Sequence, residues 1–157
     1  MRYWLMKTEP NTYSWNDLLQ DKVTCWEGVR NYQARNFMRD DMKIGDLVFI
    51  YHSVVKPMAI MGVAEVVKES YPDHFAFEQS HKYFDPKSKP EAPSWMMVDV
   101  RAKFSLKEPL TLAQLKTIPG LEEMMLLQKG SRLSIQPVRA NEYQIIVGLA
   151  ELIPEDK

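Results

Sequence analysis

The sequence has very little cysteine, no long hydrophobic run and almost no net charge, and each shortage excludes a class of protein. Cys25 is the only cysteine among 157 residues, so no disulfide can form within the chain and a cysteine-rich zinc site is impossible. No apolar run approaches the roughly 18 residues of a membrane span. The first seven residues are too short in both their basic and apolar parts for a signal peptide. We therefore expect a cytoplasmic protein that does not bind membranes.

The charge balance limits how this chain could bind nucleic acid. A protein that coats DNA without selectivity is strongly basic, whereas the net charge here is −1. Any binding must then depend on a local basic patch.

The composition is that of a folded domain. Apolar residues make up 45% of the chain, which is enough for a hydrophobic core, and charged residues make up 26%, which excludes an intrinsically disordered protein. Since repeats and linkers are missing, we expect residues 1–157 to form a single domain.

Hydrophobic periodicity predicts short strands that follow one another along the chain, with helices between and after them. The strands are expected at 3–6, 47–51, 59–67, 95–104 and 131–135. The helices are expected just after 14, at 31–40, 112–116 and 121–128, and near the end of the chain. Consecutive strands favour an α+β fold with a mostly antiparallel, strongly curved sheet.

Two segments have distinctive local patterns. Ser14 and Asp17 have the form of a capping box, and the helix that follows places Trp15, Leu18 and Leu19 on one face. We therefore assign Trp15 to the core. The loop at 71–94 is long for a connection within a compact domain, and its aromatic content argues against disorder. This loop is expected to carry function.

Eight segments, in order and over almost the whole chain, resemble the EVE domain family. They are KTEP (7–10), YSW (13–15), WEGVRNYQAR (26–35), GDLVF (45–49), YHS (51–53), GVAEV (62–66), YFDPKS (83–88) and LSIQPV (133–138). A more distant likeness is to the YTH readers of methylated adenine in RNA. The resemblance implies a PUA-like fold, a bent β-barrel with peripheral helices, and recognition of methylated or hydroxymethylated cytosine in DNA or RNA.

Reading a single base requires that the base leave the stack and enter a pocket with aromatic walls and polar groups. The resemblance implies that Trp26 forms one wall, and Tyr83 or Trp95 the other. Trp26 could instead fold onto the core beneath the long loop. The polar and flanking candidates for this base pocket are Lys7, Thr8, Asn31, Tyr32, His52, Ser53, Asp85 and Ser134. Asn31 could equally cap a helix, and His52 with Ser53 could simply end a strand.

A basic stripe is the expected contact with phosphates. Arg35 and Arg39 lie four residues apart on the predicted second helix, Arg30 directly precedes that helix, and Lys87 extends the patch from the long loop. Guanidinium groups suit phosphate because they donate two parallel hydrogen bonds. The alternative for this stripe is an ordinary solvated helix face.

The sequence gives little support for an enzyme. Pro72-Asp73 with Asp85-Pro86-Lys87 fits a metal-dependent nuclease pattern in letters only, since Pro86 cannot join a strand ladder. We expect a non-catalytic monomer that uses no metal and no cofactor and whose partner is nucleic acid carrying a modified base. The competing hypothesis is a protein-interaction module on the same fold.

Overall fold

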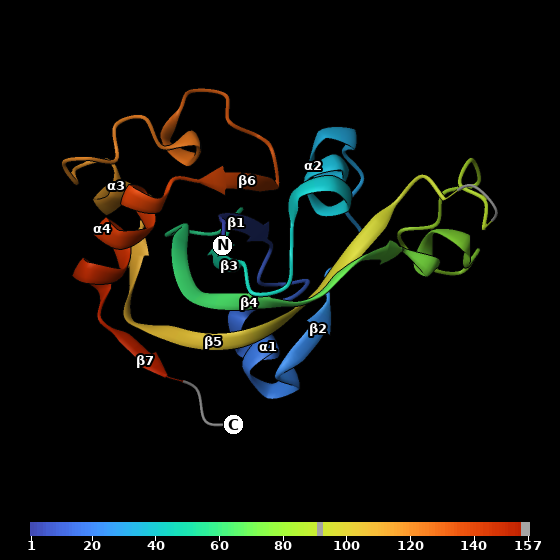
Figure 1. Ribbon diagram of the computed structural model, residues 1–157, viewed down its shortest axis with the longest axis horizontal. Helices are drawn as coiled ribbons and strands as arrows, with labels where there is room; N and C mark the ends of the chain where they lie inside the picture. Colours follow the sequence, from blue (N-terminus) through green and yellow to red (C-terminus); the bar gives the residue numbers. More distant parts are fainter. Residues whose placement is uncertain (91–92, 155–157) are drawn as a thin grey trace.

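The computed structural model describes residues 1–90 and 93–154 and is built on a curved seven-stranded sheet (Figure 1). The strands are β1 (Tyr3–Thr8), β2 (Val23–Cys25), β3 (Leu47–His52), β4 (Ala59–Pro72), β5 (Met96–Thr111), β6 (Ile135–Val138) and β7 (Leu152–Pro154). The strand order is β2-β5-β4-β3-β1-β6, with β7 paired to β5. Only β1 and β3 pair in parallel among the described strands. The expected α+β class and mostly antiparallel sheet are confirmed, although the described sheet does not close into a barrel.

The helices are short and lie around the sheet. They are α1 (Trp15–Asp21), α2 (Tyr32–Asn36), the π-helix η1 (Phe37–Asp41), the 3-10 helices η2 (His74–Phe77) and η3 (Met125–Leu127), α3 (Leu112–Leu115) and α4 (Ala140–Ala150). The capping box at the start of α1 is confirmed, because the Ser14 hydroxyl accepts from the Asp17 N–H and the Asp17 carboxylate accepts from the Ser14 N–H.

Strands β1 and β3 are buried on both faces and divide the core in two. Successive side chains of a strand point to opposite faces. Trp4 and Met6 therefore enter one cluster, which we call the first core, while Leu5, between them, enters the other, which we call the second core. In β3, Ile50 enters the first core and Phe49 enters the second. Helices α1 and α2 contribute to the first core, whereas α3 and α4 contribute to the second.

Trp15 belongs to the first core, as its helical pattern predicts. Its side chain is 3% exposed, and its indole N–H donates to the Ser105 hydroxyl over 3.0 Å. The ring lies directly on Gly62, where a Cβ would approach within 2.2 Å of it. Gly62 therefore lets β4 receive the indole ring at a distance that no other residue allows.

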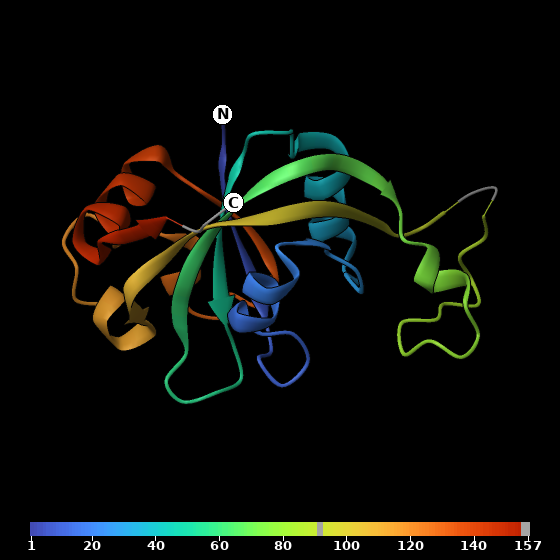
Figure 2. The same ribbon diagram turned by 90° about the horizontal axis from the view of Figure 1, so that it is seen from below.

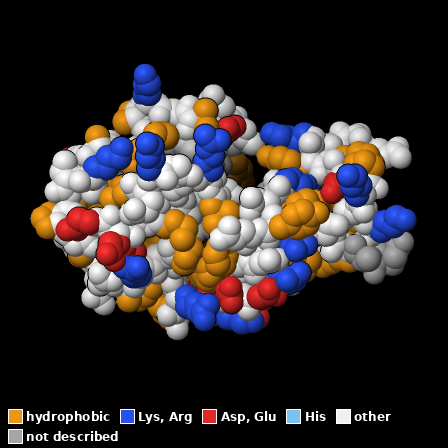
Figure 3. Space-filling view, turned by 90° about the horizontal axis from the view of Figure 1, so that it is seen from above, with side chains coloured by type: hydrophobic (Ala, Val, Ile, Leu, Met, Phe, Trp, Pro, Cys, Tyr) orange, Lys and Arg blue, Asp and Glu red, His pale blue; other side chains and the backbone are white. Residues whose placement is uncertain are grey.

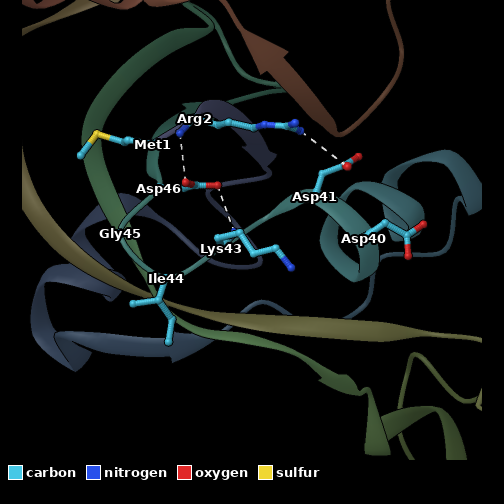
Figure 4. Close-up of a pocket in the computed structure, with 8 residues that line it drawn as sticks. All are labelled: Met1, Arg2, Asp40, Asp41, Lys43, Ile44, Gly45 and Asp46. Atoms are coloured by element: carbon cyan, nitrogen blue, oxygen red, sulfur yellow. Dashed lines mark hydrogen bonds and ion pairs between the residues drawn. The ribbon is translucent and has the colours of Figure 1, made fainter.

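Asp46 fixes the beginning of β1 to the turn before β3 (Figure 4). Its side chain is 3% exposed and accepts hydrogen bonds from the Arg2 N–H, the Trp4 indole N–H and the Lys43 N–H, each over 3.0 Å. A hollow of about 380 Å³ surrounds these groups. Because the carboxylate is fully used by the protein, Asp46 is part of the scaffold.

Several boundaries differ from those expected. Strands β4 and β5 run to residues 72 and 111 because they continue pairing through register shifts. The helix expected at 121–128 is wrong: successive i→i+3 bonds, such as that from Leu127 to Met124, make turns and the short η3. The strand expected at 131–135 begins only at its last residue, because the Gln136 amide holds Ser131 and Leu133 in a loop. Strands β2 and β7 are additional.

The long loop forms an arm, defined here as residues 73–90 and 93–95. It extends beyond the ends of β4 and β5, away from the rest of the molecule, which we call the body (Figure 1 and Figure 2). Its fixed structure includes η2 and several turns. The arm thus has the order that its aromatic content predicts.

Candidate functional site

A cavity of about 610 Å³ lies where the arm meets the body. The parallel pairing of β1 and β3 brings their carboxyl ends to one edge, and the segment 24–30 and the arm close round it. The volume falls within the roughly 300–1,000 Å³ of ordinary ligand sites. The cavity is lined by Lys7, Thr8, Glu9, Thr12, Tyr13, Thr24, Cys25, Trp26, Glu27, Gly28, Val29, Arg30, Ser53, Lys82, Tyr83, Arg132 and Ser134.

Trp26 both packs in the core and lines the cavity. Its side chain is 8% exposed within the first core, and its main-chain N–H donates to the Val98 carbonyl over 2.7 Å. Tyr13 meets its ring edge-on, with centroids 6.3 Å apart. The two interpretations of Trp26 are therefore compatible, because the indole is anchored beneath the cavity and presents its remaining surface to it.

Tyr83 is the aromatic side chain that the arm contributes to the cavity. Its ring lies against Gly28, where a Cβ would come within 2.4 Å of it. Gly28 also has φ +79°, a conformation that favours glycine. The close approach and the backbone conformation together explain why glycine occupies this position.

Asp73 ties the arm to the segment that carries Trp26. Its side chain is fully buried and accepts from the Gly28 N–H over 2.9 Å and from Arg30 Nη1 over 3.0 Å. Arg30 Nη2 donates to the Tyr83 carbonyl over 2.6 Å, and its guanidinium lies 5.5 Å from the centre of the Tyr83 ring. The expected phosphate contact at Arg30 thus lines the cavity but is ion-paired within the protein.

Seven of the predicted site residues come together at the cavity: Lys7, Thr8, Trp26, Arg30, Ser53, Tyr83 and Ser134. Lys7 donates to the Ser131 carbonyl over 3.0 Å, and burial lowers the pKa of its ammonium group. The Thr8 hydroxyl donates to the Tyr13 carbonyl over 2.7 Å. Lys7 and Thr8 end β1, and main-chain acceptors in neighbouring loops hold their side chains in place.

Trp95, the alternative second wall, does not line this cavity. Its indole N–H donates to Asp85 over 2.6 Å, and its ring stacks on Tyr32 with centroids 4.9 Å apart. That hydrogen bond is the main reason why the pKa of Asp85 lies below its usual range. Trp95, Tyr32 and Asp85 therefore form a separate cluster that holds the arm, and Tyr83 is the aromatic residue that remains for the second wall.

Asn31 and His52 also lie outside the cavity, each for a local reason. The Asn31 side chain caps α2 by accepting from the Ala34 N–H over 3.0 Å, which is the alternative noted for it. His52 Nε2 accepts from the Trp15 N–H over 3.0 Å. Burial lowers the pKa of His52, which favours this neutral acceptor form. His52 therefore fixes the start of α1.

The remaining phosphate candidates do not gather at the cavity. Arg39 pairs with its neighbour Asp40, and Arg35 donates to the Ser94 carbonyl over 2.8 Å while covering the Tyr32 ring. Lys87 is exposed on the arm. Arg35 lies on α2 and Arg39 on η1, and acceptors on the neighbouring residues Asn36 and Asp40 take up their guanidinium groups.

Basic residues from distant segments gather at the cavity. Lys7, Arg30, Lys82 and Arg132 line the cavity, against the two acidic residues Glu9 and Glu27. Arg132 is exposed and has no ion pair with any described residue. The surface is hollowed between the body and the arm, with Lys and Arg side chains on both sides of the hollow (Figure 3). No sequence pattern predicts that Arg132 or Glu27 belongs to the site, because neither residue is part of a periodic segment.

The nuclease pattern does not form a site. Asp73 is buried against Arg30, and Asp85 accepts from Trp95 and the Lys87 N–H. Within residues 1–90 and 93–154, no group of three or more His, Cys, Asp or Glu side chains is placed to hold a metal ion. In the same described part of the chain, no helix is long and apolar enough to cross a membrane.

The chain belongs to the EVE domain family, whose model matches residues 2–149. Mouse thymocyte nuclear protein 1 is 44% identical over 97% of this chain and 75% of its own length. A hypothetical protein from Leishmania major superposes with a TM-score of 0.91 at 44% identity, covering 96% of this chain and 95% of that one. The human THYN1 protein, solved in complex with DNA containing 5-methylcytosine, superposes with a TM-score of 0.87 at 41% identity, covering 96% and 98%. These neighbours confirm the expected PUA-like fold.

Proposed function

We propose that this protein binds methylated DNA without catalysis and holds a flipped 5-methylcytosine in the cavity between Trp26 and Tyr83. The observation that carries the proposal is the solved complex of human THYN1 with DNA containing 5-methylcytosine, a protein 41% identical to this chain over 96% of its length. The cavity of about 610 Å³ supplies the space that an extruded base needs.

The aromatic side chains supply the affinity for the base. Stacking of one base on an aromatic ring contributes roughly 1–3 kcal/mol and is available to any base. Trp26 is anchored in the first core, so its ring is in position before DNA arrives. A rigid wall limits the entropy lost on binding.

The charges round the cavity supply contacts with the backbone. Lys82 and Arg132 are exposed on opposite sides, one on the arm and one before β6. Phosphate contacts position the nucleic acid and are insensitive to sequence. This local patch reconciles DNA binding with a net charge of −1.

The test is a titration with matched duplexes that carry cytosine or 5-methylcytosine at one position. We expect the wild type to prefer the methylated duplex, and Trp26→Ala to lose about 1–3 kcal/mol of binding together with most of that preference. Phe104→Ala is the matched control, because Phe104 is a partly buried aromatic residue on β5 outside the cavity. An equal loss of binding free energy in both variants would show that the base is bound elsewhere.

A cleavage assay separates the proposal from the nuclease alternative. We expect single- and double-stranded DNA and RNA to remain intact in Mg²⁺ or Mn²⁺. Metal-dependent products that disappear in Asp85→Ala would overturn the non-catalytic function. A protein that neither binds nor cleaves any of these nucleic acids would instead support the protein-interaction module.

A further inference from the structure

Glu27 brings an unused carboxyl group into the cavity directly after Trp26. Its Oε2 atom is buried and has no hydrogen-bond partner. The side chain as a whole is 34% exposed and lines the cavity. A carboxyl oxygen buried without a partner loses its hydration without compensation, which is costly unless a ligand provides a donor.

The nearest group of opposite polarity stops short of a hydrogen bond. His81 Nε2 lies 3.9 Å from Glu27 Oε2, beyond the roughly 3.2 Å reach of an N–H···O bond. His81 Nδ1 accepts from the Tyr83 N–H over 3.1 Å, so the imidazole is held by the arm. Burial raises the pKa of Glu27, and the charges of His81, His74 and Arg30 oppose that rise while Asp73 adds to it. The ionised carboxylate only accepts hydrogen bonds, and this is the form that would distinguish an amino group from an oxygen.

We propose that Glu27 accepts a hydrogen bond from the exocyclic amino group of the flipped cytosine and thereby selects cytosine over thymine. This inference rests on the proposed function of the same cavity. Carboxylates are the side chains that accept from cytosine N4. Thymine has an oxygen at the same position. Two hydrogen-bond acceptors would then face each other with no proton between them.

Other polar side chains at the cavity fit this role less well. An amino group needs an acceptor, whereas Lys7 only donates. The Thr8 and Ser53 hydroxyls donate to main-chain carbonyls and offer neutral oxygens, which accept less strongly than a carboxylate. Glu9 is the other carboxylate, but it is exposed at the edge of the cavity. Glu27 is next to Trp26 in the chain, so the same short segment supplies a stacking surface and a hydrogen-bond acceptor.

The experiment compares 5-methylcytosine with thymine, which share the methyl group and differ at position 4. Each base is placed opposite an abasic site, so that the cost of unpairing is the same for both. We expect the wild type to bind 5-methylcytosine about tenfold more tightly than thymine. Glu27→Gln should bring the two affinities close together, because its amide can donate to the thymine oxygen. Its preference for 5-methylcytosine over cytosine should persist, because the methyl group lies on another edge of the base.

Glu9→Gln is the matched control and should keep the wild-type ratio between 5-methylcytosine and thymine. Circular dichroism verifies that each variant is folded, and Glu27→Ala, which has no polar group, should also lose the ratio. A Glu27→Gln protein that rejects thymine as strongly as the wild type would overturn the role of Glu27. If the wild type prefers 5-methylcytosine to cytosine but binds thymine equally well, Glu27 is excluded while the proposed function stands. If it distinguishes none of the three bases, the proposed function itself fails.

Discussion

The body and the arm are ordered by different physical means. In the body, β1 and β3 bury apolar side chains on both faces of the sheet, and two hydrophobic cores result. In the arm, order depends on buried polar groups and aromatic contacts. Asp73 holds Gly28 and Arg30, and the rings of Phe75, His81 and Tyr83 follow one another at 4.5 and 5.6 Å between centroids.

The contrast matters because the cavity has one wall of each kind. Trp26 comes from the body and is fixed by apolar packing, whereas Tyr83 comes from the arm and is fixed through Asp73, Arg30 and Gly28. Apolar packing is spread over many contacts, so a single substitution removes a part of it. The arm depends on few contacts, so one substitution there should loosen a wall without unfolding the body.

Trp15→Ala tests the body and should have the largest effect on stability. The indole is 3% exposed and fills the space above Gly62, so its removal should cost about 3–5 kcal/mol of unfolding free energy. Trp26→Ala should cost less, because part of that ring faces a cavity that already exists. Chemical denaturation of both variants measures the difference. A larger loss for Trp26→Ala would show that the wall is mainly structural.

Asp73→Ala tests the arm. Breaking a buried ion pair typically costs about 3–5 kcal/mol, and we expect about 2–3 kcal/mol here because the Arg30 side chain is 23% exposed and keeps its bond to the Tyr83 carbonyl. Hydrogen exchange should accelerate in the arm and remain unchanged in β1 and β3. Asp40→Ala, which breaks an exposed pair, is the control. Uniform acceleration over the whole chain would contradict the division into body and arm.

The same division explains what the sequence could predict. The continuous apolar run of β3 and the capping box at Ser14 are local signals with local causes, and both correspond to the observed elements. The helix expected at 121–128 had the right apolar spacing, but its residues form turns that bury Leu121, Met124 and Leu126 without a continuous helix.

The site was less predictable because it is assembled from long-range contacts. Trp26 and Tyr83 are far apart in sequence and meet at one cavity through the contacts of Asp73, Arg30 and Gly28. The arginine stripe had regular spacing, yet Arg35 and Arg39 found acceptors near their own helix. Charge spacing along a helix therefore gave poor information about charges round a cavity, where Arg132 comes from a separate loop.

Gly28→Ala tests how the two walls are joined. A side chain here meets both an unfavourable φ of +79° and the Tyr83 ring. Gly130→Ala is the matched control, since Gly130 has φ +77° with no atom within 4 Å of the added Cβ. Both variants should lose about 1 kcal/mol of stability from backbone strain. Only Gly28→Ala should displace Tyr83 and weaken the preference for 5-methylcytosine. Equal binding by the two variants would show that the position of Tyr83 is not critical.

The smallest expected effect concerns the charges at the edge of the cavity. Arg132 is exposed, lines the cavity and has no ion pair with any residue in the described ranges, so its guanidinium is available to a phosphate. Arg132→Ala should lower the slope of log affinity against log salt by about 1, and it should weaken methylated and unmethylated duplexes equally. Arg39→Ala is the control, because Arg39 is already paired with Asp40 and lies away from the cavity. Titrations at several salt concentrations measure both slopes. If Arg39→Ala lowers the slope and Arg132→Ala does not, the DNA backbone follows η1 and the original stripe instead of the loop before β6.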